Sequence, residues 1–212
     1  MDSPDRGAPT GMAAGSSLKL RLVVPLWLLL IAIGGTLLWR FETRPGPSVG
    51  PAYRWPATSQ LATQSNRPTL VIFAHPQCPC TRATLSELDR VLARVGDRVE
   101  THVVFVRPGG VAAGWEASDL WTAAKAIPGV QVEVDEHGAE AKRFGAVTSG
   151  HTLLYSDGQL QFSGGITGAR GHAGDNEGED ALVAFLTTGR SNRTSTPVFG
   201  CSLLNDASLP GE

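Results

Sequence analysis

The segment from residue 69 to residue 95 reads TLVIFAHPQCPCTRATLSELDRVLARV. It opens with an apolar run, Thr69–Ala74, which predicts a buried strand. From Pro79 onward, apolar side chains recur at helical spacing, which predicts a helix that ends near Val95. Cys78 and Cys80 therefore lie where a strand gives way to the N-terminus of a helix.

Only Pro79 separates the two cysteines, and a thiol pair at a helix start is typical of redox-active or metal-binding cysteine. Proline suits the first turn of a helix, because the N–H that it lacks has no partner there. We therefore expect Cys78 at the N-cap and Cys80 in the first turn, where free N–H groups and the helix dipole stabilise a thiolate. Cys78, expected to be the more exposed, is the predicted nucleophile, and Cys80 is predicted to resolve the mixed disulfide.

The length, charge and cysteine count limit the classes of protein to which the chain can belong. The chain has 212 residues, three cysteines and a formal net charge of -2. This length fits one domain of ordinary size with appendages. The charge gives no indication of a nucleic-acid partner, and three cysteines are too few for a disulfide-rich scaffold.

Residues 22–39 (LVVPLWLLLIAIGGTLLW) carry no charge, and this run is about the minimum length for crossing a bilayer. We expect a transmembrane signal anchor over residues 18–40, preceded by a disordered N-terminus over residues 1–17. A cleaved secretory signal is the alternative, but its apolar region is usually shorter and followed by small residues. Leu37–Arg40 offers no such cleavage site. The expected topology is a single pass through the cytoplasmic membrane, with the C-terminal domain extracytoplasmic (periplasmic).

Four prolines between residues 41 and 56 predict a stiff linker that holds a domain off the membrane. Strand and helix patterns then alternate over residues 57–190, which is typical of an α/β domain with a partly parallel sheet. Residues 191–212 form a C-terminal tail that contains Cys201. Beyond the first strand and helix, we expect strands over 99–106, 130–134, 152–155 and 159–162, and helices over 115–126, 139–144 and 179–188.

This order of elements is that of a thioredoxin-like three-layer sandwich with an inserted β-α unit. Three motifs carry a closer resemblance: HPQCPCTRATLSEL at 75–88, FGAVTSGHTLLYSDG at 144–158 and TPVFGC at 196–201. Over residues 53–203 the chain resembles the membrane-anchored thioredoxin-like proteins of the RedB type. The resemblance implies this fold and, with the Cys-Pro-Cys pair, thiol–disulfide chemistry.

The cysteine spacing departs from the Cys-x-x-Cys of thioredoxins. If Pro79 and Cys80 are matched to that family's Pro-Cys, the usual nucleophile position falls on Gln77. A disulfide across one residue closes a small ring in which the preferred torsion is difficult to reach. Such strain raises the reduction potential, so we expect a labile pair rather than a structural disulfide.

His151 marks a second departure from the family. Thioredoxins place a cis-proline that faces the cysteines just before the hairpin, and here His151, preceded by Gly150, stands about there. A histidine facing two thiols could transfer protons during exchange, because its pKa lies near neutrality. Alternatively, Cys78, Cys80 and His151 form a set that suits copper. The copper-delivering Sco proteins, similar in fold and anchoring, use two cysteines and a histidine from this hairpin, although their cysteines are three residues apart.

Cys201 has two interpretations. It is a buried thiol in a tail packed on the domain, or it returns to the active site as a third thiol, a resolving partner or a metal ligand. The glycine-rich loop over residues 164–178 is expected on the Cys78 side of the sheet, because the second hairpin strand runs parallel to the first strand. Arg170, His172 and Asp175 then either line a substrate cleft or belong to a solvated loop.

The leading hypothesis is a membrane-anchored, extracytoplasmic thiol–disulfide oxidoreductase that needs no cofactor and acts on a protein thiol or disulfide partner. The runner-up is a copper-binding or copper-delivery protein, and a thiol peroxidase ranks third because the flanking threonine and arginine of that site are missing. Inert core cysteines are a further alternative. Another is a structural zinc site, whose four ligands could come from His75, Cys78, Cys80 and either Cys201 or His151. The candidate substrate-cleft residues are Gln77, Gly150, Arg170 and His172.

Overall fold

The computed structural model describes residues 14–63 and 66–204. Its first element is the helix α1 (Ala14–Glu42), in which Leu20–Glu42 is long and apolar enough to cross a membrane, with a mean hydropathy of 2.3. The helix begins inside the range 1–17 for which the sequence predicts disorder, because extending an existing helix adds one hydrogen bond for each residue fixed. The remainder of that range, residues 1–13, lies outside the described residues.

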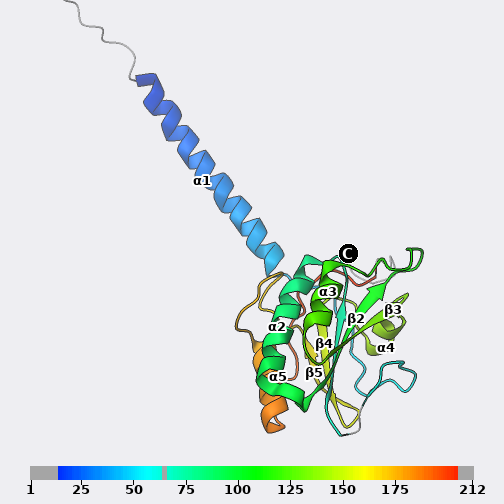
Figure 1. Cartoon of the computed structure of the whole chain (residues 1–212). Coiled ribbons are helices and arrows are strands. Elements are labelled where there is room, and N and C mark those ends of the chain that lie inside the picture. The colour runs from blue at the N-terminus through cyan, green and yellow to red at the C-terminus, as the bar shows by residue number, and fades with distance from the viewer. Residues whose placement is uncertain (1–13, 64–65, 205–212) are drawn as a thin grey trace, which may run out of the picture. The chain divides into compact units, whose positions relative to one another are not determined.

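The chain from Glu42 onward forms a compact unit built on a five-stranded sheet. The strands are β1 (Thr69–Ala74), β2 (Glu100–Arg107), β3 (Val130–Glu136), β4 (His151–Ser156) and β5 (Gln159–Gly164). Their order is β3-β2-β1-β4-β5 (Figure 1). β1, β2 and β3 run parallel to one another, whereas β4 is antiparallel to both β1 and β5.

Helices cover both faces of this sheet. They are α2 (Pro79–Val95), α3 (Asp119–Ala126), α4 (Ala139–Phe144) and α5 (Glu177–Thr188), with a short 3₁₀ helix, Gly96–Arg98, after α2. Apolar side chains of α2, α3 and α5 share one cluster with Leu70 and Ile72 of β1. Those of α4 share a second cluster with Val71 and Phe73, and we call this face the α4 side. Alternate residues of a strand point to opposite faces, which separates the two clusters.

The result is a thioredoxin-like three-layer α/β sandwich, as the sequence predicts. The inserted unit is α3 with β3, which adds a strand at the sheet edge next to β2. Both β1 and β5 are antiparallel to β4, so their C-terminal ends lie at the same end of the sheet as the start of β4. The start of α2 and the loop that follows β5 therefore lie at that end too.

The proline-rich segment over residues 41–56, for which the sequence predicts a stiff linker, makes contacts with the domain. The Ala52 N–H donates to the Phe144 carbonyl oxygen (3.2 Å), and the Tyr155 hydroxyl donates to the Ala52 carbonyl oxygen (2.7 Å). The indole of Trp55 packs edge-on against the rings of Phe144 and Tyr155. Prolines keep the segment extended, but the apolar area of Trp55 draws it onto the α4 side.

Candidate active site

Cys78 is the N-cap residue of α2, with φ -86° and ψ 117°, and Pro79 occupies the first turn. Two backbone hydrogen bonds fix this turn. The Cys78 N–H donates to the His75 carbonyl oxygen (3.1 Å), and the Thr81 N–H donates to the Cys78 carbonyl oxygen (3.0 Å). The Cys78 sulfur therefore lies at the positive end of the helix, as the sequence predicts.

Cys201 from the C-terminal tail lies against Cys78. The two Sγ atoms are 2.9 Å apart, and all three cysteines are free thiols. Cys78 is 1% exposed and Cys80 is 9% exposed. The prediction that Cys78 is the more exposed of the pair is therefore wrong, because the tail packs against it.

The tail reaches the thiols by antiparallel pairing with the segment that precedes β4. The Ser149 N–H donates to the Cys201 carbonyl oxygen (2.8 Å), and the Leu203 N–H donates to the Val147 carbonyl oxygen (2.9 Å). At Gly200 the backbones approach so closely that a Cβ would lie 1.9 Å from the Ser149 carbonyl oxygen. A glycine is therefore required at that position.

The three thiols differ in acidity. Burial raises the pKa of Cys78, but hydrogen bonds with the Cys201 thiol and with the N–H groups of Cys201, Cys80 and Thr81 bring the pKa below its ordinary value. Burial and the adjacent Cys78 raise the pKa of Cys80, and they raise that of Cys201 to about 12. Cys78 is therefore the thiol that ionises first, which is the property of a nucleophile.

Arg170, from the loop after β5, connects this loop to the tail. Its Nη1 donates to the Gly200 carbonyl oxygen (2.6 Å), and its Nε donates to the Arg44 carbonyl oxygen (3.2 Å). Its positive charge opposes the effect of burial on the pKa of Cys80, and the Gly171 N–H donates toward the Cys80 thiol. The loop therefore borders the thiol site and holds the tail there.

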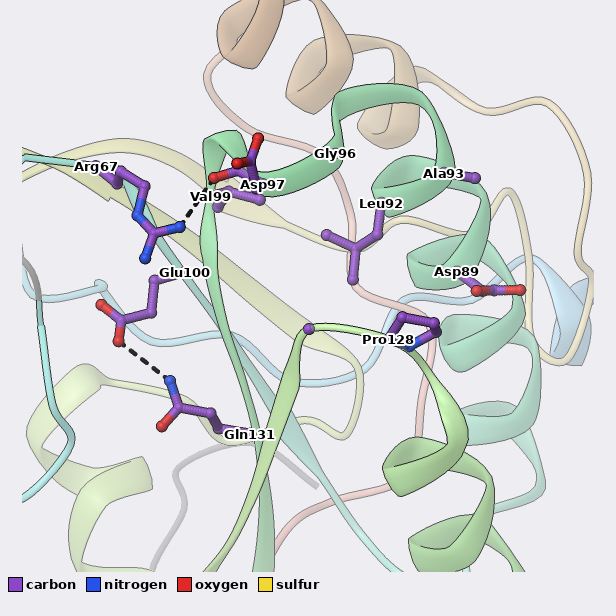
Figure 2. A pocket seen from close by; sticks show the side chains of 11 residues that line it. Arg67, Asp89, Leu92, Ala93, Gly96, Asp97, Val99, Glu100, Pro128 and Gln131 are labelled. Atoms are coloured by element: carbon purple, nitrogen blue, oxygen red, sulfur yellow. Dashed lines mark hydrogen bonds between the residues drawn. The ribbon is translucent and has the colours of Figure 1, made fainter.

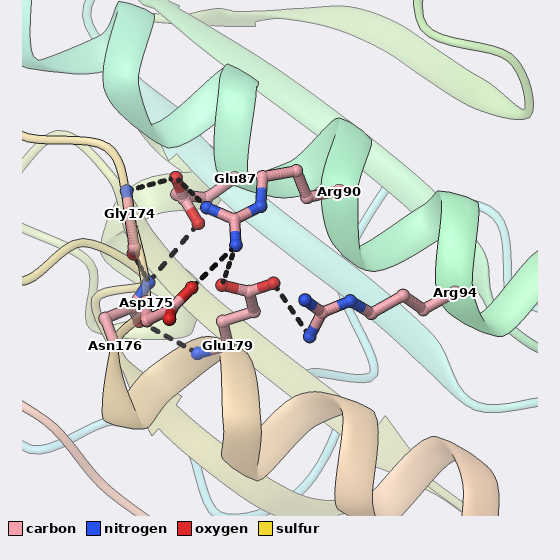
Figure 3. Close-up of polar contacts among 7 residues, drawn as sticks. All are labelled: Glu87, Arg90, Arg94, Gly174, Asp175, Asn176 and Glu179. Carbon is pink, nitrogen blue, oxygen red and sulfur yellow. Dashed lines mark hydrogen bonds and ion pairs between the residues drawn. The ribbon is translucent and has the colours of Figure 1, made fainter.

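The other end of this loop is bound to α2 through Glu87 (Figure 3). The Glu87 carboxylate is buried and accepts hydrogen bonds from the Gly174 N–H (2.8 Å) and the Arg90 guanidinium (3.4 Å). Arg90 also forms ion pairs with Asp175 (2.9 Å) and Glu179 (3.7 Å). The loop is thus held against the helix that begins at the thiol site.

His151 does not lie where the sequence predicts it. Its partner on β1 is Phe73, and directly opposite residues of antiparallel strands project to the same face, here the α4 side. The imidazole Nε2 lies 2.8 Å from the Ser163 Oγ of β5, and burial lowers the pKa of His151 to about 4. The ring is therefore neutral at pH 7 and links β4 to β5. This position does not fit the predicted roles in proton transfer and copper ligation beside the cysteines.

The predicted metal sites do not assemble either. Within residues 14–63 and 66–204, no three His, Cys, Asp or Glu side chains are grouped so that they could hold a metal ion. His75, proposed as a zinc ligand, packs its ring edge-on against Trp115, with ring centroids 5.4 Å apart.

The remaining candidate residues have distinct environments. Gln77 is exposed, and its N–H donates to the His75 Nδ1 (3.2 Å). His172 is also exposed, and its Nδ1 lies 2.8 Å from the Arg170 carbonyl oxygen. Gly150 has a φ of +88° and donates its N–H to the Phe73 carbonyl oxygen (2.8 Å), so glycine is needed there to turn the chain into β4.

Sequence reasoning missed a pair of hydroxyl groups, those of Thr81 and Ser149. Their oxygens are 2.9 Å apart, and the Ser149 Oγ also accepts the His75 N–H (2.9 Å). This pair binds the start of α2 to the segment that the tail covers. No local signal marks it, because the two residues are 68 positions apart in the sequence.

A cavity of about 530 Å³ lies at the C-terminal end of α2, away from the cysteines (Figure 2). Its polar lining is largely satisfied within the protein. Arg67 donates to the Asp97 carbonyl oxygen (3.0 Å), and the Gln131 amide donates to the Glu100 carboxylate (3.1 Å). No cysteine lines this cavity, so it is separate from the thiol site.

Comparisons with known proteins support the fold. No family model matches the chain, and a search of the curated proteins finds no match. An uncharacterized conserved protein from Geobacillus kaustophilus is similar at 18% identity and a TM-score of 0.56, over 79% of this chain and 95% of that chain. A hypothetical protein from Sinorhizobium meliloti is similar at 20% identity and a TM-score of 0.53, over 76% of this chain and 93% of that chain.

A secreted disulfide oxidoreductase from Mycobacterium tuberculosis is also similar, at 17% identity and a TM-score of 0.41, over 58% of this chain and 82% of that chain. At these identities the similarities concern the fold, and the two higher scores agree with the α/β architecture. The sheet order and the two helical layers define the class, a thioredoxin-like domain.

Proposed function

We propose that this protein is a thiol–disulfide oxidoreductase in which Cys78 is the nucleophile. The observation that carries the proposal is the position of Cys78 at the start of α2, with a lowered pKa and a second thiol 2.9 Å away. A thiolate of this kind attacks one sulfur of a partner disulfide and forms a mixed disulfide, which a second thiol then resolves. The thiols themselves carry the electrons, so this chemistry needs no cofactor.

We further propose that α1 anchors the protein in the cytoplasmic membrane, with the thiol domain on the extracytoplasmic side. The apolar helix and the resemblance to the RedB-type proteins support the anchor. Disulfide exchange is favoured outside the cytoplasm, where thiols are not kept reduced. The partner in this proposal is a protein that carries a thiol pair or a disulfide.

Activity tests the chemistry. The full-length protein in detergent is expected to accelerate the reduction of insulin disulfides by dithiothreitol, and Cys78→Ser is expected to reduce this to the uncatalysed rate. Ser86→Ala, at an exposed position of α2, is the matched control and should retain the activity. Full activity in the Cys78→Ser variant would show that the proposal is wrong.

Accessibility tests the topology. Trypsin added to spheroplasts is expected to cleave at the exposed residues Arg190 and Arg193 without lysis of the cells. Protection of these sites until the membrane is broken would place the domain on the cytoplasmic side.

A further inference from the structure

The structure offers two thiols that could resolve a mixed disulfide on Cys78. Cys80 is one residue beyond Pro79 in the first turn of α2, so a bond to it would close a strained small ring. Cys201 approaches from a separate segment, and its Sγ lies 2.9 Å from that of Cys78. The ring that it would close contains most of the domain and adds no such local strain.

We propose that Cys201, rather than Cys80, is the resolving cysteine, so that Cys78 and Cys201 form the reversible disulfide of this protein. This inference rests on the proposed function and assigns the second redox residue of that same site. Cys80 remains a thiol throughout the cycle.

The reaction balances with a partner disulfide as the oxidant. The Cys78 thiolate attacks one partner sulfur, the partner S–S bond breaks, and the other partner sulfur leaves as a thiolate. The Cys201 sulfur then attacks the Cys78 Sγ, which forms the Cys78–Cys201 bond and releases the first partner sulfur. Two electrons pass from the Cys78–Cys201 pair to the partner, and the two thiol protons of the pair end on the two partner sulfurs.

Contacts of the tail with the rest of the domain hold Cys201 in this position. Its backbone pairs with Ser149 at Cys201 itself and with Val147 at Leu203, two residues further on. Arg170 holds the Gly200 carbonyl oxygen (2.6 Å), and Leu203 is 1% exposed within the α4-side cluster. These contacts direct Cys201 at Cys78 whenever the tail is docked.

Burial determines the order of events. Because Cys78 is 1% exposed, a partner disulfide reaches it only after the tail has moved aside. The tail then returns, and Cys201 meets the Cys78 sulfur of the mixed disulfide. In that state the Cys78 sulfur carries no negative charge. The charge repulsion from Cys78, which raises the pKa of Cys201, is therefore absent.

Peptide mapping tests the proposal. The reduced full-length protein in detergent is treated with equimolar dithiodipyridine, quenched with N-ethylmaleimide and digested with trypsin without reduction. Trypsin cleaves after Arg82 and Arg193, so a Cys78–Cys201 disulfide joins the peptides 55–82 and 194–212. A Cys78–Cys80 disulfide stays within the first of these peptides.

The wild type and Cys80→Ser are expected to give the joined peptides and to release both halves of the reagent. Cys201→Ser is expected to lose the joined peptides and to stop at a mixed disulfide on Cys78, with near-UV circular dichroism as the check that it is folded. Because Cys80→Ser keeps Cys201, its result tests the proposal even if the Cys201 variant unfolds.

The opposite pattern, with Cys80→Ser arrested at the mixed disulfide and Cys201→Ser resolved within peptide 55–82, would overturn this inference and leave the proposed function standing. A wild type in which Cys78 forms no disulfide at all, neither with the reagent nor with another cysteine, would instead remove the proposed function, and the inference with it.

Discussion

The acidity of Cys78 depends on donors from two distant parts of the chain. The N–H groups of Cys80 and Thr81 belong to the start of α2, and any helix start of this kind provides them. The Cys201 thiol and N–H come from the tail and are present only when the tail is docked. Docking of the tail therefore both covers Cys78 and promotes its ionisation.

Cys201→Ala should make Cys78 less acidic, because it removes the thiol whose hydrogen bond with the Cys78 sulfur lowers the pKa of Cys78. The ratio of the Cys78 alkylation rate at neutral pH to the rate at alkaline pH should fall about tenfold, since a hydrogen bond to a charged group contributes about 1.5 kcal/mol. This ratio, followed by mass spectrometry with iodoacetamide, separates ionisation from accessibility. The control is Ser202→Ala, because the Ser202 hydroxyl donates its hydrogen bond to the Leu204 carbonyl oxygen. An unchanged ratio in Cys201→Ala would contradict the assignment.

His151 should make the domain sensitive to acid. Its pKa is about 4 in the folded protein and near 6.5 when exposed, so the unfolded state binds more protons between these values and stability falls as the pH drops through them. The loss attributable to His151 should approach about 3 kcal/mol at pH 4. Urea unfolding of the full-length protein at a series of pH values measures it.

The variant His151→Gln should flatten this part of the stability curve relative to the wild type, whereas His172→Gln, at an exposed position, should leave the curve unchanged. If His151→Gln and the wild type lose stability in parallel below pH 6.5, the imidazole is not buried and neutral as described.

Among the helices and strands, those with strong local signals have the predicted bounds. β1, α2 and α4 begin and end where the sequence places them, because an apolar run, a proline at the helix start and a flanking glycine each act locally. The helix predicted over residues 115–126 starts later, at Asp119, since the Ser118 side chain caps it by accepting the Trp121 N–H. Its first predicted turn therefore lies outside the helix.

The contacts of the site depend on register and on distant pairing, which local patterns do not encode. His151 is directly opposite Phe73, and a shift of one residue in this register would turn it to the other face. Cys201 lies 123 positions from Cys78, and no periodicity in the tail indicates where it packs. The sequence thus predicted the fold and the position of Cys78 at the start of α2, but it left the role of Cys201 open and did not indicate that the His151 ring contacts Ser163.

Glu87 should be important for holding the loop after β5 to α2. Glu87→Ala leaves the partly buried Gly174 N–H without its acceptor and is expected to lower the free energy of unfolding by about 2 kcal/mol. Urea unfolding monitored by tryptophan fluorescence measures this. Asp175→Ala, which removes the 95% exposed partner of Arg90, should change stability by about 0.5 kcal/mol or less. Equal effects of the two substitutions would argue against a special role for the buried carboxylate.

Gly200→Ala should dislodge the tail. The added Cβ would meet the Ser149 carbonyl oxygen at 1.9 Å, and backbone atoms must move to relieve this contact. We expect a loss of about 2 kcal/mol in stability and faster labelling of Cys78 by a maleimide dye at high pH, where ionisation is complete. Gly168→Ala, with open space around its Cβ, serves as the control. A Cys78 that labels no faster in Gly200→Ala than in the wild type would mean that the tail does not cover it.

At the scale of the whole molecule, the chain combines an apolar N-terminal helix with a thioredoxin-like domain whose two ends meet near the thiols. Arg170 bonds both to Arg44, near the start of the domain, and to Gly200, near its end. The tail thus belongs to the folded unit, and its cysteine completes the thiol site. Thiol chemistry at Cys78 is the central claim that these observations support.

A redox titration of the full-length protein tests this claim most directly. The protein in detergent is equilibrated with dithiothreitol buffers of stepwise potential, and its free thiols are counted by maleimide mass tagging. We predict that a pair of thiols is lost and regained reversibly, as a single two-electron transition, and that Cys78→Ser abolishes this transition. Thiols that stay reduced across the whole range, or a transition that persists in Cys78→Ser, would contradict the account.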